Sequence, residues 1–223
     1  MDSKKHITLA SLPLLQGIAP LDIARVLEET QHRETCLSPG ESLARQGDEC
    51  QHLLLLVKGM LKSDRRSPDG LYTFTEYLTA PVVIEPEILY GICRNHAASY
   101  TATEECHIIS FPKHDVNRMM AALEVFRFNF LNLLSTLAVR GYKAALPTAT
   151  PDLKARISHF IASHARTAVG CKRLNIRIAD LAHYLGVSRA VVSTALHEME
   201  AAGLLHTKRN IIEISEMEKL TLE

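Results

Sequence analysis

The sequence predicts an α+β chain in which a strand-rich part, a long helix and a helical part with a terminal hairpin follow one another. In residues 33-113, Gly and Pro separate short runs of β-branched, aromatic or continuously apolar residues. From residue 114 no Gly or Pro occurs until Gly141, and after residue 152 apolar residues recur at helical spacing. We therefore expect domains at 1-113 and 148-223, joined by a helix and hinge at 114-147.

The composition is that of an ordinary globular protein. Its 223 residues are 47% hydrophobic, enough for one or two cores, and its formal net charge of zero argues against a uniformly basic surface. No run approaches about 18 apolar residues, and the N-terminus lacks a sustained apolar segment. We therefore expect no membrane contact and a cytoplasmic location.

Residues 20-30 have apolar side chains at helical spacing and predict one short helix. Five later runs are typical of strands, and the turn signals between them favour an antiparallel barrel or sandwich. The runs are HLLLLVK (52-58), LYTFTEYL (71-78), PVVI (81-84), SYTAT (99-103) and CHIISF (106-111).

The long helix carries large apolar residues at alternating steps of three and four, the heptad-like pattern of a coiled-coil seam. One interpretation is a dimer seam offered to a second copy of the chain. The other is a core helix buried in its own domain, and periodicity alone does not separate the two. The row comprises Leu123, Phe126, Phe130, Leu133 and Leu137.

The segment Pro147 to Pro151 predicts a hinge, and the next helix begins near Asp152 and leads into RTAVGCKRLN (166-175), which we expect to be a loop. Two helices joined by a fixed turn then follow: Gly186 ends the first, and Ser188 is a good N-cap for the second. Their apolar stripes are Ile178, Leu181, Ala182 and Leu185, then Val191, Val192, Ala195, Leu196 and Met199.

The opposite face of the second helix carries short side chains around one Arg, which lets a helix approach the DNA major groove. Residues 206-214 then predict a two-stranded wing with a cationic tip. We predict DNA contacts from both elements, although such a helical hairpin also occurs as a purely structural feature. The predicted contacts are Ser188, Arg189, Ala190, Ser193, Thr194 and His197 on the helix, and Lys208 and Arg209 on the wing.

Three strings resemble the Crp/Fnr superfamily of bacterial transcription regulators. PGESLARQGD (39-48) and LLLLVKGMLK (53-62) are similar to its barrel turns and strand pair, and LAHYLGVSRAVVSTALHEMEAAGLL (181-205) to its helix-turn-helix. The resemblance implies an N-terminal cyclic-nucleotide-binding-like antiparallel β-roll (a double-stranded β-helix, or jelly roll), a dimerisation helix and a C-terminal winged helix-turn-helix. It also implies a homodimer on a pseudo-palindromic operator in double-stranded DNA, an unknown small-molecule effector, and RNA polymerase as a partner.

Within this resemblance the second helix departs from the usual pattern. Ser188 and Arg189 match phosphate- and base-contacting positions, but Ala190 stands where many members have an acidic residue and Thr194 where many have a second Arg. Because Glu accepts from cytosine and Arg binds guanine, their absence predicts a different operator. Arg177 also stands where a Ser or Thr N-cap is common.

The implied effector pocket departs further. The family's nucleotide-binding members use a Gly-Glu pair for ribose and an Arg for the cyclic phosphate, whereas this chain has Pro86 before Glu87, and His96 near the Arg position. Pro lacks an amide donor, and neutral His supplies no charge. We predict a pocket of Glu87, Arg94, His96 and Tyr142 that does not bind cyclic AMP.

We therefore predict a dimeric, sequence-specific DNA-binding regulator and not an enzyme. The alternatives are a ligand-binding or protein-interaction module with a structural helix-turn-helix, and an enzyme built on the barrel. We expect no metal site and no cofactor, and haem ligation is a further hypothesis motivated by the eleven His residues and by haem sensing in the superfamily. The cysteines lack C-x-x-C spacing and do not indicate disulfides or a metal cluster: Cys36, Cys50, Cys93, Cys106 and Cys171.

Overall fold

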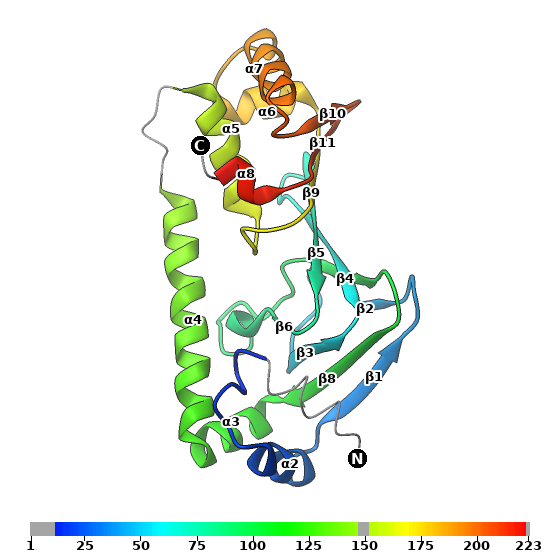
Figure 1. Cartoon of the computed structure of the whole chain (residues 1–223), viewed down its shortest axis with the longest axis vertical. Coiled ribbons are helices and arrows are strands. Elements are labelled where there is room, and N and C mark those ends of the chain that lie inside the picture. The colour runs from blue at the N-terminus through cyan, green and yellow to red at the C-terminus, as the bar shows by residue number, and fades with distance from the viewer. Residues whose placement is uncertain (1–11, 147–151, 222–223) are drawn as a thin grey trace. The chain divides into compact units, whose positions relative to one another are not determined.

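A computed structural model describes residues 12-146 and 152-221 (Figure 1). The chain forms two compact units: the first runs to Ser63 and resumes at Leu78–Val139, and the second comprises Asp64–Tyr77 and the described residues from Arg140 onward. The segment Asp64–Tyr77 therefore belongs with the C-terminal part, whereas the sequence-based boundary at residue 113 places it in the first domain. The hinge predicted at 147-151 lies outside the described residues.

The first unit is built on antiparallel strands, as the sequence predicts. Four of them form a sheet in the order β1-β8-β3-β6, and β7 pairs with β2 in the other sheet. The elements are α2 (Pro20–Glu29), β1 (Arg33–Leu37), β2 (Ser42–Ala44), β3 (His52–Lys58), β4 (Met60–Arg66), β6 (Val82–Ile84), η1 (Pro86–Ile88), β7 (Ser99–Ala102) and β8 (Cys106–Pro112).

Strand β3 shows why its sequence is continuously apolar. Leu53, Leu55 and Val57 belong to the core cluster that includes residues of α2 and of the two helices after β8, α3 (Lys113–Ala122) and α4 (Glu124–Ala145). Leu54 and Leu56 belong to the cluster inside the roll. Successive side chains of a strand point to opposite faces, so a strand covered on both faces needs apolar residues at every position.

The helix expected from residue 114 is broken, which corrects that prediction. It forms α3 (Lys113–Ala122) and α4 (Glu124–Ala145), bent by 119° at Leu123, whose backbone is extended. The bend lets Met119 on α3 and Phe126 on α4 bury their side chains in one core. No single described helix is long and apolar enough to cross a membrane, and the bent pair passes that test only by length and composition.

The row of residues proposed as a dimer seam faces the interior of its own chain, because its two phenylalanines are buried in the core. Phe126 and Phe130 are each 1% exposed, and Leu123 and Leu133 pack against the same cluster. Leu137 is half-buried. Of the two interpretations of this row, the core helix is correct for these residues.

The second unit is a three-stranded sheet extended by one strand from earlier in the chain. Its strand order is β10-β11-β9-β5, and β5 pairs antiparallel with β9 from Tyr72↔Ile176 to Glu76↔Lys172. The elements are β5 (Tyr72–Thr79, of which residues to Tyr77 belong here), α5 (Leu153–His164), β9 (Lys172–Ile176), α6 (Ile178–Leu185), α7 (Arg189–Ala201), β10 (His206–Lys208), β11 (Ile211–Ile214) and α8 (Met217–Thr221).

Strand β9 corrects the prediction of a loop for residues 172-175, whereas residues 166-171 form neither helix nor strand, as predicted. Its alternating side chains Lys172, Leu174 and Ile176 are all buried, but the lysine at the first inward position disguises the apolar alternation. That lysine is tolerated inside because its ammonium lies 3.3 Å from a carboxylate oxygen of Glu76 on β5. Both residues of the pair are 1% exposed.

Candidate functional site

The turn between α6 and α7 has the geometry that the sequence predicts. Gly186 adopts a left-handed conformation with φ 64°, and its amide donates to His183 O at 3.1 Å. The Ser188 side chain accepts from the amide of Val191 at 3.4 Å and so caps α7. Arg177 provides no cap for α6, as expected, and instead binds Asp180 through two nitrogens at 2.6 and 2.9 Å.

The buried stripe of α7 fixes which face of the helix remains exposed. Val192, Ala195, Leu196 and Met199 are buried, at the i, i+3, i+4 and i+7 spacing of a single helix face. Val191, which the sequence analysis placed in this stripe, is 51% exposed and lies outside it. The exposed face therefore includes Val191 as well as the predicted polar residues.

The predicted contact residues gather on this exposed face. Ser188, Arg189, Ala190, Thr194 and His197 are exposed, and Ser193 is half-buried. They extend over the N-terminal two-thirds of α7, the part of a recognition helix that contacts base edges and phosphates.

Two polar side chains on this face are held by the helix backbone. The Thr194 hydroxyl donates to Ala190 O at 3.1 Å and is thereby bound to its own helix backbone. His197 Nδ1 lies 2.8 Å from Ser193 O, and because a carbonyl only accepts, Nδ1 carries the proton. In the neutral ring Nε2 is then an acceptor.

The wing carries two cationic side chains, of which one is paired with a carboxylate. Strands β10 and β11 pair from His206↔Glu213 to Lys208↔Ile211, and Asn210 turns the chain with φ 59°. Lys208 lies 2.7 Å from Glu213, as does Arg173, and these two hydrogen bonds lower the pKa of Glu213. Arg209 at the tip forms no ion pair with any described residue.

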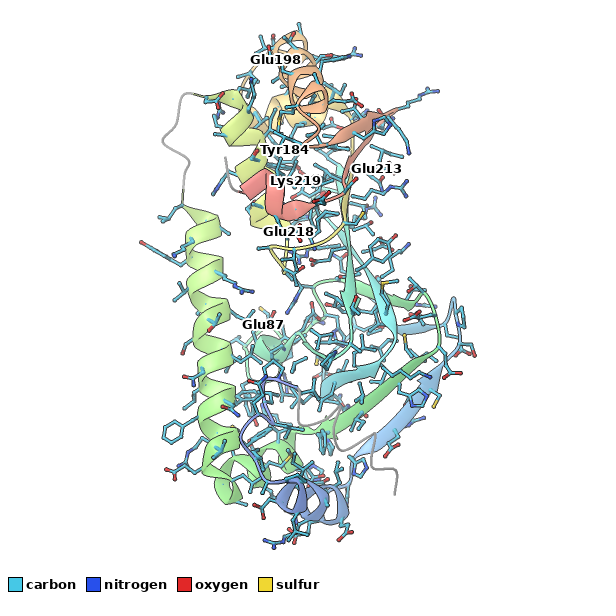
Figure 2. The ribbon with its side chains drawn as sticks, viewed as in Figure 1. Glu87, Tyr184, Glu198, Glu213, Glu218 and Lys219 are labelled. Atoms are coloured by element: carbon cyan, nitrogen blue, oxygen red, sulfur yellow. The ribbon has the colours of Figure 1, made fainter. Side chains whose placement is uncertain are left out.

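The four residues predicted for the effector pocket do not form one buried cluster. Glu87 on η1 is exposed, and Tyr142 on α4 is 68% exposed (Figure 2 labels Glu87). Arg94 is half-exposed and pairs with Glu49 at 3.2 Å. His96 is buried, at 6% exposure.

His96 binds a residue that the sequence analysis did not select. Its Nδ1 lies 2.7 Å from one carboxylate oxygen of Glu85, and the amide of Ala97 donates to the other at 3.0 Å. Hydrogen bonds with Cys50, and then with Glu85, raise the pKa of His96 to about 9, so the ring is an imidazolium at neutral pH. This raised pKa differs from the sequence-based expectation of a neutral His at this position.

The cysteines are all free, two of them buried and three exposed. Within residues 12-146 and 152-221, no three His, Cys, Asp or Glu side chains are placed to hold a metal ion. The structure thus offers no described ligand set from which metal or cluster chemistry would follow.

Comparison with known proteins decides the family. A model of the cyclic nucleotide-binding domain matches residues 34–122, and a model of the Crp-like helix-turn-helix domain matches residues 155–222. The chain belongs to the Crp/Fnr superfamily. The two matches account for both units and for their order in the chain.

Individual relatives of this Crp/Fnr chain are distant. Electron transport regulator A of Shewanella oneidensis is 21% identical over 202 residues, which cover 88% of this chain and 80% of that protein. The sensor domain of the transcriptional regulator DNR from Pseudomonas aeruginosa has a TM-score of 0.53 at 19% identity and covers 69% of this chain and 100% of that one. The N-terminal domain of a transcriptional regulator from Streptomyces coelicolor has a TM-score of 0.50 at 19% identity, with 65% and 99% covered. At these identities the two structures show the fold alone.

Proposed function

We propose that this chain is a dimeric, sequence-specific DNA-binding transcription regulator whose sensor does not take cyclic AMP. The observation that carries the proposal is the exposed face of α7. Arg189 forms no ion pair with any described residue, and it stands between the short side chains of Ser188, Ala190 and Ser193. A free guanidinium among small residues suits close approach to a groove, whereas a solvent-facing bundle helix usually carries paired charges.

The operator preference follows from the same face. Arg189 is the long cationic side chain available to bind guanine through two hydrogen bonds. Ala190 and the Thr194 methyl group are suited to contact with thymine methyls, because the Thr194 hydroxyl is bound to its own backbone. The acceptor on neutral His197 suits an exocyclic amino group of adenine or cytosine.

The sensor proposal rests on the position of the predicted pocket residues. Glu87 and Tyr142 are exposed, and Arg94 already pairs with Glu49. The cation that is buried, His96, is bound to Glu85. A cyclic phosphate would have to compete with a carboxylate of this chain for that cation.

The dimer seam that we propose lies on the exposed face of α4. Its residues follow alternating steps of three and four, and all are exposed, unlike those of the row first predicted. Polar residues at two central positions are typical of seams whose register is specified at some cost in stability. The row comprises Val125, Phe128, Asn132, Ser135, Val139 and Tyr142.

The experiment that tests DNA binding is selection of bound duplexes from a random pool by the full chain, followed by salt titration of the selected site. We expect a symmetric pair of half-sites and an affinity that falls steeply with salt, by about 0.9 in the log–log slope per neutralised phosphate. Absent or salt-insensitive binding would favour the alternative, an interaction module with a structural helix-turn-helix.

The dimer seam is tested by sedimentation of a Phe128→Glu/Val139→Glu variant. Two like charges in each copy at facing seam positions should convert the dimer to a monomer. Gly141→Glu is the matched control, because it lies on α4 outside the row and a side chain added there meets nothing within 4 Å. A variant that remains dimeric contradicts this seam.

A further inference from the structure

The group around Glu85 is a small anion-binding site whose occupant comes from the chain itself. Donors of this group include the ring of His96 and the amide of Ala97, and each binds a different oxygen of one carboxylate, at 2.7 and 3.0 Å. An imidazolium beside a free amide is a donor pair that binds oxyanions such as carboxylates and phosphates. Here that anion is the Glu85 side chain.

The donors are held in place without Glu85. The backbone of His96 pairs with the preceding loop, since its amide donates to Asp48 O at 2.8 Å and its carbonyl accepts from Gly47 at 2.9 Å. The amide of Cys50 donates to Arg94 O at 2.6 Å in the same antiparallel arrangement. The donor pair therefore belongs to one element, and the carboxylate comes from another, at the junction of β6 and η1.

The backbone of Glu85 shows that the carboxylate is held there against local preference. Its φ is 43° and its ψ is 50°, a left-handed conformation that a glutamate rarely adopts, and Pro86 follows at the start of η1. Such a conformation persists where surrounding contacts determine it. Here the contacts are those of the carboxylate with His96 and Ala97.

The site is dry as well as charged. Glu85 is 1% exposed and His96 6%, and the ring of His96 lies edge-on to Tyr100, with centroids 6.2 Å apart. A buried cation requires a partner, because desolvation without one is strongly unfavourable. Removal of the carboxylate would leave the ring of His96 and the amide of Ala97 without the anion that binds them, and an added oxyanion that binds both donors would restore the pair.

We propose that Glu85 is an internal ligand, whose carboxylate occupies an oxyanion site of His96 and Ala97 and keeps phosphate-bearing molecules out of it. The sensor is in this respect permanently filled, and an effector phosphate binds at this place only when Glu85 is displaced. The inference rests on the proposed role of the first unit as a sensor, but not on DNA binding.

The test uses the full chain without DNA, so that failure of DNA binding does not affect it. Inorganic phosphate and cyclic AMP are titrated separately by calorimetry, and the ring nitrogens of His96 are followed by NMR. For the wild type we expect no saturable change at His96 with either probe. For Glu85→Gly, which also suits the left-handed backbone, we expect phosphate to bind at least tenfold more tightly than to the wild type.

A Glu85→Gly/His96→Ala variant should lose that gained binding, which assigns it to this site. If cyclic AMP also binds Glu85→Gly, the site takes phosphodiesters as well as the free ion. If Glu85→Gly is unfolded, Glu85→Gln keeps the side-chain shape without its charge, and phosphate should then perturb the His96 ring. A folded Glu85→Gly or Glu85→Gln that leaves His96 unchanged by phosphate overturns the proposal, as does wild-type binding of equal affinity.

Discussion

A deeply buried ion pair occurs among the described residues of each unit, and the two pairs are of different kinds. Glu85 and His96 lie close in sequence in the first unit, and their contact involves a left-handed backbone and a ring whose pKa is raised to about 9. Glu76 and Lys172 in the second unit face each other across β5 and β9, strands from distant parts of the sequence.

The surroundings of the two pairs indicate different roles. Lys172 also donates to Thr167 Oγ1 at 2.7 Å and to Val169 O at 3.0 Å, and Glu76 accepts from the amide of Arg166. That network joins β5 to the sheet of the helix-turn-helix unit. We infer that the second pair, which links two paired strands, is structural, whereas the first occupies a site.

The largest expected effect is on the structural pair. Glu76→Gln leaves the Lys172 ammonium buried without its counter-charge, and breaking such a pair costs about 3–5 kcal/mol. Urea unfolding of the full chain measures this as a lower midpoint for the transition of the second unit. Glu76→Gln/Lys172→Met should recover part of the loss, because it removes the uncompensated charge.

A matched control is Glu105→Gln, which breaks the Lys58–Glu105 pair at 2.8 Å. Both of those side chains are more than 60% exposed, and exposed pairs contribute about 0–1 kcal/mol. If Glu76→Gln costs no more than Glu105→Gln, then the buried pair does not hold β5 in the second unit.

The raised pKa of His96, which hydrogen bonds with Cys50 and then with Glu85 cause, should make stability depend on pH. The folded pKa of His96, about 9, lies above its ordinary value of 6.5, so the stabilisation is full below pH 6.5 and is lost as pH rises through 9. The difference corresponds to at most about 3 kcal/mol. Unfolding free energies at pH 6 and pH 9.5 measure the loss, and His96→Asn, which cannot titrate, should show a smaller one.

Local patterns in the sequence predict much of this fold. The run from His52 to Lys58 predicts β3, and the Gly186 and Ser188 signals predict the turn of the helix-turn-helix. These features depend on side-chain periodicity and capping within a few residues. The residues that determine each of these features lie within the same short segment of the sequence.

The sequence-based predictions fail where the local structure depends on residues distant in the sequence. The sequence does not indicate strand β9, because the carboxylate that neutralises its buried Lys172 is on β5. It does not indicate a role for Glu85 either, because the fold brings its partner His96 to it. Phe126 and Phe130 have the heptad-like spacing of a dimer seam, but they lie in the core of their own chain. A helix with two apolar rows does not reveal from periodicity which row faces inward.

The same contrast between paired and unpaired charges applies to the face of α7 that we propose binds DNA. Arg189 pairs with no acidic residue in the described part of the chain, and if it contacts a base, Arg189→Ala should cost about 1–3 kcal/mol on the selected operator and less on other sequences. Competition binding against single-base operator variants measures this discrimination. An equal loss on every sequence would make Arg189 a phosphate contact instead.

The two wing cations allow the smallest and most direct comparison. Arg209 is free and should bind a phosphate, so Arg209→Ala should weaken binding to all sequences alike and reduce the salt slope by about one. Lys208 already pairs with Glu213 at 2.7 Å and releases little additional counterion on binding, so Lys208→Ala should change the slope less. Arg33→Ala, an exposed arginine on β1, is the control and should leave the slope unchanged. Equal slopes for Arg209→Ala and Lys208→Ala would mean that the Glu213 pair opens when DNA binds, and that the wing cations act together.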